Sequence, residues 1–194
     1  ATRKAGITMA LSGLGGDELF CGYDIFRRTV ELEAKTWLNY IPVGIRSLAG
    51  NFIKRRSGVA GEKKAAILGL DEISFSTFYP ISRRVLLDDD IRKILNRKIQ
   101  GENAVNEITD SIATRFPFSD HVLGRVSIAE MTTYMLNVLL RDTDQMSMAH
   151  ALEVRVPFLD YNLVEYVLNL PDSYKFPDTP KKLLVNSCSD LLPP

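Results

Sequence analysis

The chain contains near its beginning the stretch Met9-Ala-Leu-Ser-Gly-Leu-Gly-Gly-Asp-Glu-Leu-Phe-Cys-Gly-Tyr23. Ile7 to Leu11 is short, apolar and partly β-branched, which predicts a buried strand. Three glycines in the four positions after Ser12 then allow the backbone to turn sharply and to approach a ligand closely. Residues 18–35 predict a helix with a core-facing stripe. The glycines are therefore expected at the carboxyl end of a strand, where α/β sheets bind ligands.

Two carboxylates, Asp17 and Glu18, follow the glycines directly. Beside a phosphate they would repel the ligand unless a cation intervened, which favours a bridging Mg²⁺. The alternative is structural. Asp17 then caps the helix and Glu18 lies in its first turn, where the helix dipole favours an acid. The spacing alone leaves both interpretations open.

Length and composition are typical of an ordinary globular domain. The 194 residues can bury a sizeable core, and 24 basic and 24 acidic residues balance, so neither nucleic acid nor an anionic membrane is an expected partner. No apolar run approaches the ~20 residues of a membrane helix, and we find no signal peptide. Cys21 and Cys188 lack metal-like spacing, which favours reduced thiols and a cytoplasmic location. Cys21 is interpreted as a small packing residue, since no histidine is near it in sequence.

The rest of the chain predicts a mostly helical body. Residues 120–140 form the longest periodic stretch, with an apolar arc wide enough for a helix buried on most sides. Residues 153–157 are expected to be extended, because the residue before Pro157 avoids the helical region. A further helix is expected over 161–170. One parallel strand cannot stand alone, so we expect the chain to be a fragment of a longer protein.

Four charged residues lie after the long helix, where unpaired buried charges would be costly. They are Asp144, Glu153, Arg155 and Asp160. Glu153 and Arg155 are two residues apart, so on an extended segment they point to the same face. Asp160 is placed to cap the helix that follows. Two interpretations stay open for the four residues, namely a structural ion-pair network or the border of a ligand site.

Three blocks resemble the glutamine-dependent asparagine synthetases and occur in that family's order. They are Ser12-Gly-Leu-Gly-Gly-Asp-Glu-Leu-Phe-Cys-Gly-Tyr23, Leu139-Leu-Arg-Asp-Thr-Asp-Gln-Met-Ser-Met-Ala-His-Ala-Leu-Glu-Val-Arg-Val-Pro-Phe-Leu-Asp160, and Leu170-Pro followed by Lys181-Lys-Leu-Leu. The resemblance implies a single domain over 1–194. Its expected fold is mainly α, the helical C-terminal portion of an α/β adenine-nucleotide-hydrolase-like (PP-loop) synthetase domain. At most one or two short parallel strands are expected near the N-terminus.

The family activates a carboxylate with ATP, forms an acyl-adenylate and Mg²⁺-pyrophosphate, and then makes an amide with glutamine-derived ammonia. The resemblance therefore implies an asparagine-synthetase-type ligase that uses ATP and Mg²⁺, with aspartate or a related acid as substrate. It implies Asp17 as the metal ligand, and Glu18 and Lys181 as catalytic residues. The substrate-binding and nucleotide-binding residues that it implies are Ser12, Gly13, Gly15, Gly16, Tyr23, Asp144 and Glu153.

The sequence also departs from the family pattern. Leu14 replaces the usual glutamate, which is the favoured proton acceptor, Gln145 replaces an arginine, and Val185 replaces the arginine of the lysine segment. The family's upstream Ser-Gly-Gly-x-Asp-Ser loop and its glutaminase domain are not in this sequence, so the chain alone is expected to be inactive. Two functions stay open: a ligase whose acceptor may differ from aspartate, or a non-catalytic helical scaffold. The strand edge at residues 7–11 also predicts a possible homodimer.

Overall fold

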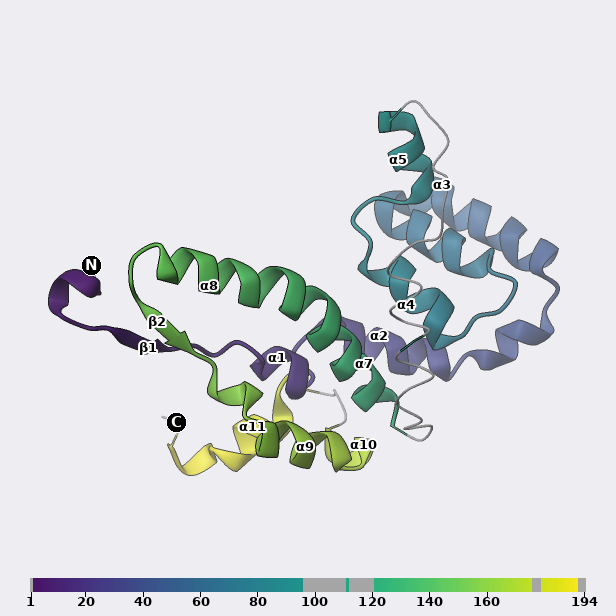
Figure 1. Cartoon of the computed structure of the whole chain (residues 1–194). Coiled ribbons are helices and arrows are strands. Elements are labelled where there is room, and N and C mark those ends of the chain that lie inside the picture. Colours follow the sequence, from purple (N-terminus) through teal and green to yellow (C-terminus); the bar gives the residue numbers. More distant parts are fainter. Residues whose placement is uncertain (1, 96–110, 112–120, 176–178, 192–194) are drawn as a thin grey trace. The chain divides into compact units, whose positions relative to one another are not determined.

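The computed structural model of the chain describes residues 2–95, 111, 121–175 and 179–191 (Figure 1). Contacts divide the chain into two compact units. The first consists of Ala1–Arg28 with Phe118–Pro194, and the second is Thr29–Pro117. The single domain over 1–194 stays a prediction.

The first unit contains a two-stranded parallel sheet. Strand β1 (Met9–Leu11) pairs with β2 (Glu153–Arg155), with Met9 opposite Glu153 and Leu11 opposite Arg155. The ladder continues at one end, where the Ser12 N–H donates to the carbonyl of Arg155 at 2.8 Å. Figure 1 shows the two strands side by side near the N-terminus. The expectation of a mainly α fold with at most two short parallel strands is confirmed.

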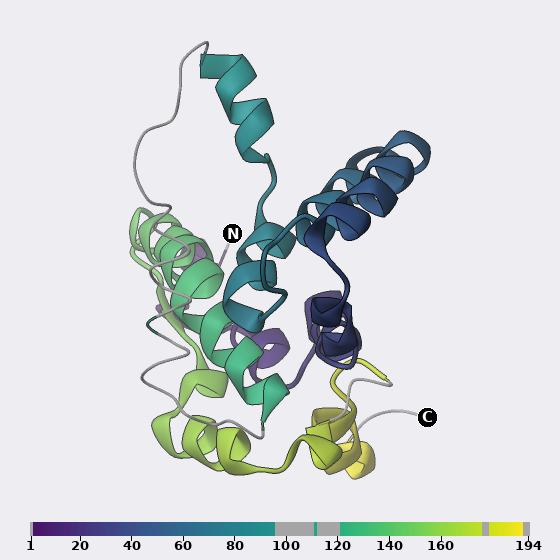
Figure 2. The same ribbon diagram turned by 90° about the vertical axis from the view of Figure 1, so that its right-hand side faces the viewer.

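Helices make up most of the first unit. They are η1 (Arg3–Ala5), α1 (Gly16–Leu19), the beginning of α2 (Asp24–Glu33), α7 (Val122–Glu130), η3 (Met131–Leu140), α8 (Arg141–Met148), η4 (Pro157–Leu159), α9 (Tyr161–Asn169), α10 (Asp172–Lys175), α11 (Lys182–Ser187) and η5 (Ser189–Leu191). Figure 2 shows α7, η3 and α8 as one continuous helix, of which η3 is π-helical. The predicted long helix is therefore confirmed.

The predicted burial of these elements is only partly correct. Met9 and Leu11 are 41% and 70% exposed, because both lie on one face of β1 and the two-stranded sheet leaves that face uncovered. In the long helix, α7 is buried where it packs against α1, α9 and α10. The next segment, η3, exposes Leu136 and Val138. The expectation of a buried first strand is thus wrong, and the expectation of a helix buried on most sides is wrong over η3.

A Schellman-type turn interrupts the helix that the sequence predicts over residues 18–35. Helix α1 ends at Leu19, and α2 does not begin until Asp24. Between them Cys21 has φ 58°, and the Gly22 N–H donates to the carbonyl of Asp17 at 2.8 Å. A left-handed residue followed by this backward hydrogen bond closes a helix C-terminus. The turn brings Gly22 back against Asp17, which the predicted continuous helix would not do.

An apolar cluster fixes α1 relative to the C-terminal helices. Leu19, Phe20 and Val167 are buried together, and the Phe20 and Phe158 rings meet edge to face with their centroids 5.8 Å apart. Aliphatic residues from α9 and α11 complete the cluster, namely Leu163, Val164, Leu168, Leu183 and Leu184. The start of α11 is thereby held in the same cluster as the end of α1.

The second unit is helical where it is described. Its elements are the rest of α2, η2 (Thr36–Tyr40), α3 (Val43–Leu68), α4 (Phe75–Arg83) and α5 (Asp88–Leu95). Helix α3 packs on α4, and Phe75 stacks on Tyr79 with ring centroids 5.1 Å apart. Buried Arg46 donates to the carbonyls of Ile41 and Asp71, which ties both ends of α3 to neighbouring turns. In the described part of the chain we find no helix with the length and apolar character needed to cross a membrane.

Candidate functional site

The glycine loop between β1 and α1 lies at the carboxyl ends of the two parallel strands, as predicted. Ser12 begins the loop, and its Oγ accepts a hydrogen bond from the Leu14 N–H at 3.3 Å. Gly15 has φ 91°, and a Cβ there would lie 2.6 Å from Cδ2 of Leu159. Only glycine fits this backbone conformation and this close approach. The loop is thus pressed against η4, the segment that follows the end of β2.

Asp17 and Lys181 form an ion pair beside this loop. Nζ of Lys181 lies 2.9 Å from Oδ1 of Asp17, and both side chains are about one-third exposed. Lys181 occupies the left-handed region, with φ 57°, immediately before α11. The core contacts of Leu183 and Leu184 hold α11 in place. The fold thus joins two residues from opposite ends of the chain, which the family resemblance implies as a metal ligand and a phosphate-binding lysine.

The structure bears on the structural interpretation of the two acids at the start of α1. Gly15, and not Asp17, is the N-cap of α1, so the capping role of Asp17 is wrong. Glu18 does lie in the first turn, where the dipole favours it. It is also buried, with only 1% of its surface exposed. A carboxylate so far from water needs a hydrogen-bond donor.

Tyr23 supplies that donor. Its hydroxyl donates to Oε1 of Glu18 at 2.9 Å. Burial and this hydrogen bond raise the pKa of Tyr23 well above its usual range, and the charges of Glu18, Asp17 and Glu130 raise it further. Tyr23 is therefore a neutral hydroxyl at physiological pH, surrounded by carboxylates.

The second charged constellation divides into separate parts. Nε of Arg155 donates to Oε1 of Glu153 at 2.7 Å, so the prediction that they share a face is confirmed. Asp160 caps α9 as predicted, accepting from the N–H groups of Asn162 and Leu163. Glu153 pairs with Met9 and so lies about 10 Å along the ladder from the glycine loop. Asp144 is exposed on α8. Binding roles for Glu153 and Asp144 therefore stay predictions.

One buried charged residue of this region, Glu130, escaped the sequence reasoning. Glu130 is fully buried at the end of α7. The sequence feature that could have revealed it is a single acid within an apolar periodic stretch. Lys175 is buried too. Its Nζ lies 3.8 Å from Oδ1 of Asp172 and donates to the carbonyl of Leu168, while burial lowers the pKa of Lys175. Burial raises the pKa of the neighbouring Cys21 thiol to about 12, which agrees with its predicted role as a packing residue.

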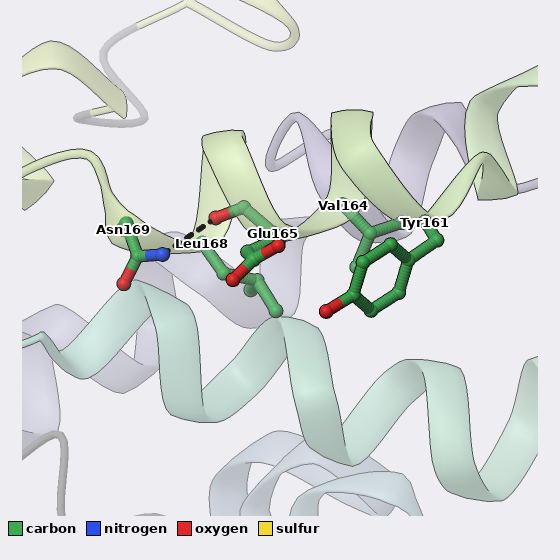
Figure 3. A pocket seen from close by; sticks show the side chains of 5 residues that line it. All are labelled: Tyr161, Val164, Glu165, Leu168 and Asn169. Carbon is green, nitrogen blue, oxygen red and sulfur yellow. Dashed lines mark hydrogen bonds between the residues drawn. The ribbon is translucent and has the colours of Figure 1, made fainter.

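A separate hollow of about 340 Å³ lies along α9 (Figure 3). Its lining consists of Tyr161, Val164, Glu165, Leu168 and Asn169. Nδ2 of Asn169 donates to the carbonyl of Glu165 at 2.9 Å. The lining includes one carboxylate and no cation, which does not suit a phosphate. The glycine loop with Asp17 and Lys181 is therefore the better candidate site.

We expect Gly22→Ala to destabilise the fold by about 1–3 kcal/mol, the usual cost of overpacking. A Cβ at residue 22 would lie 2.0 Å from Oδ1 and 2.9 Å from Cα of Asp17, so the backbone itself must shift. Gly13→Ala is the matched control, because a Cβ at residue 13 meets nothing within 4 Å. Thermal unfolding of both variants measures the difference. Equal melting temperatures would show that the turn does not press on Asp17.

Comparison with known proteins identifies the family. The family model for asparagine synthase matches residues 1–194. The chain belongs to the asparagine synthase family. It is 26% identical over 193 residues to asparagine synthetase [glutamine-hydrolyzing] 1 of Bacillus subtilis, covering 98% of this chain and 29% of that protein. The chain thus spans less than a third of the length of this curated relative.

Other curated proteins are similar over different lengths of the chain. Asparagine synthetase [glutamine-hydrolyzing] 3 of Bacillus subtilis is 36% identical over 115 residues, which cover 56% of this chain and 18% of that protein. Amidase chry2 of Gibberella zeae is 30% identical over 194 residues, covering 90% of this chain and 27% of that protein. No solved structure matches the chain. The assignment of the chain to the asparagine synthase family therefore rests on sequence similarity, and the geometry of the site comes from the structure of this chain alone.

Proposed function

We propose that the whole protein is an ATP-dependent amide-forming ligase. It adenylates a carboxylate, aspartate or a related acid, and then transfers glutamine-derived ammonia to it. Membership of the asparagine synthase family supports the reaction class. By itself, chain 1–194 does not turn over, because its sequence has no Ser-Gly-Gly-x-Asp-Ser loop. A cytoplasmic location and homodimerisation are part of the same proposal.

The observation that supports this function most directly is the Asp17–Lys181 pair at the glycine loop. Adenylation releases pyrophosphate, and its barrier falls when developing negative charge meets fixed positive charge. Lys181 offers a mobile point charge for a phosphate oxygen. The partly exposed loop places this ammonium at the carboxyl ends of the strands, where nucleotides bind in α/β folds. In our proposal Asp17 and Lys181 separate when the nucleotide enters, and each binds its own part of it.

The residues present fit a magnesium ion that arrives with the nucleotide. Mg²⁺ in nucleotide sites is commonly held by one or two carboxylates together with phosphate oxygens and water. Asp17 offers one accessible carboxylate of this kind. The described residues hold no group of three or more potential ligands, so they do not form a metal cage of their own. When bound, the ion would neutralise charge on the leaving pyrophosphate.

The acceptor is the open part of the proposal. Leu14 cannot take a proton from the attacking nitrogen. The site therefore differs from the family pattern at the position where a glutamate is the favoured proton acceptor. The similarity to a fungal protein named an amidase is compatible with a different acid. Leu14 and Gln145 also favour the second candidate, a non-catalytic scaffold. The buried Glu18 and the Asp17–Lys181 pair favour the ligase, because a decayed site has no reason to keep them.

ATP–[³²P]pyrophosphate exchange in the full-length protein tests this function. We expect exchange, in the presence of Mg²⁺, with one member of a panel of acidic amino acids and other carboxylates. Exchange with one acid would establish adenylation and identify the acceptor. Folded full-length protein that exchanges with no acid would favour the scaffold instead. Chain 1–194, assayed in parallel, is expected to show no exchange.

A further inference from the structure

Amide formation, the second half of the proposed function, needs a group that the glycine loop does not supply. Ammonia that attacks an acyl carbon must lose a proton, and general base catalysis of this transfer typically contributes 10²–10⁴-fold. Leu14 cannot serve, and the ammonium of Lys181 is a donor only. The inference below rests on the proposed function and concerns the described residues that can accept the proton.

Glu18 is a base that substrate cannot reach directly. Its carboxylate lies under the loop with 1% of the residue exposed. The Tyr23 hydroxyl donates to Oε1 of Glu18 at 2.9 Å, and Tyr23 itself is only partly buried. Tyr23 is therefore the accessible end of a hydrogen-bonded pair whose inner end is a carboxylate.

The turn at Gly22 places this pair beside the predicted metal ligand. Gly22 approaches Asp17 so closely that a Cβ at residue 22 would clash with Oδ1 of Asp17. Tyr23 is the next residue along the chain, and the Asp17 charge acts on its hydroxyl. Asp17 in turn contacts Lys181. Tyr23 therefore directly follows the residue that packs against Asp17, which is one of the two groups that we assign to the pyrophosphate.

The surroundings of Tyr23 oppose ionisation of its hydroxyl, because burial and nearby carboxylates raise the pKa of Tyr23. Glu18 and Asp17 from α1 and Glu130 from the end of α7 all oppose ionisation of the tyrosine, and Lys181 faces Asp17 from α11. Tyrosinate is thus disfavoured, so Tyr23 is not a base by itself. It can pass a proton onward only if Glu18 receives one at the same time. Glu130 is the last residue of α7 and directly precedes the π-helical segment η3, a type of irregularity that is frequent at functional sites.

We propose that Tyr23 and Glu18 form a proton relay that replaces the carboxylate missing at Leu14. The nitrogen–carbon bond forms, the acyl–oxygen bond to AMP breaks, and one nitrogen-bound proton moves to Oη of Tyr23. The hydroxyl proton of Tyr23 moves simultaneously to Oε1 of Glu18. Tyr23 stays neutral throughout, and Glu18 ends the step as a neutral acid. Return of that proton through Tyr23 to solvent restores the pair after the amide leaves.

The test compares two half-reactions in the full-length protein. Adenylation is measured by ATP–pyrophosphate exchange, and amide formation by single turnover with ammonia. We expect Tyr23→Phe and Glu18→Gln each to lower the ratio of amide formation to exchange by about 10²–10³-fold. Tyr161→Phe, which changes an exposed tyrosine on α9, is the matched control and should leave the ratio within about twofold.

Each outcome separates the relay from the proposed function. A ratio of amide formation to exchange that does not change in Tyr23→Phe would overturn the relay and leave the ligase intact. An equal fall in both half-reactions would show a merely structural role and would also overturn it. Absence of exchange in the parent protein would instead overturn the proposed function. If Tyr23→Phe fails to fold, the isosteric Glu18→Gln variant answers the same question.

Discussion

Asp17→Asn is expected to reduce ATP–pyrophosphate exchange by about 10²–10³-fold in the full-length protein, the scale of losing one electrostatic contact to a developing charge. The amide has the shape of the carboxylate, so the close contact with Gly22 and the turn after α1 remain. The change removes the charge that would attract a cation. It also removes the ion pair with Lys181, which lies 2.9 Å away. Melting temperature should therefore change little while exchange is nearly lost.

Asp24→Asn is the matched control for this experiment. Asp24 is the first residue of α2, after the turn that ends α1. Its exposed carboxylate contacts Arg27 and Arg28 on the surface of α2. Exposed pairs of this kind contribute about 0–1 kcal/mol to stability. We expect exchange in Asp24→Asn to stay within about twofold of the parent. If Asp17→Asn retained full exchange at saturating and at limiting Mg²⁺, Asp17 would be excluded as a metal ligand.

The local features of this site could be predicted because they depend on neighbouring residues. A short apolar strand, three glycines and two acids predict a strand, a tight turn and a helix start, and the structure has all three. The same holds for the helix that begins after Asp160, whose side chain accepts two backbone hydrogen bonds as expected. These elements need only capping, periodicity and backbone preference.

Features that depend on distant contacts could not be predicted from the residues alone. Nothing local to Lys181 distinguishes it from Lys182, and only the family resemblance selected it. The burial of Glu18 follows from the packing of α1 against α7, far away in sequence. The break after Leu19 escaped prediction for another reason. Cys21 adopts a left-handed conformation that usually belongs to glycine, and the apolar period continues across the break.

The conformation of Lys181 leads to a prediction that separates stability from catalysis. A non-glycine residue in the left-handed region costs about 1–2 kcal/mol, and Lys181 has φ 57°. Lys181→Gly removes this strain together with the side chain, whereas Lys181→Ala removes the side chain and keeps the strain. We therefore expect the glycine variant to be more stable than the alanine variant by about 1 kcal/mol, measured by chemical unfolding.

Both variants should lose ATP–pyrophosphate exchange to the same degree, by about 10²-fold, because each lacks the ammonium that meets the pyrophosphate. Lys182→Ala, one residue along at the exposed start of α11, is the control and should keep exchange within about twofold. If exchange followed stability instead, so that the glycine variant exceeded the alanine variant, Lys181 would act through the position of α11. Equal loss in two variants of unequal stability assigns the effect to the charge. Glycine at position 181 would relieve the backbone strain but would lack the ammonium. The strained lysine is then retained because its ammonium is needed at the site.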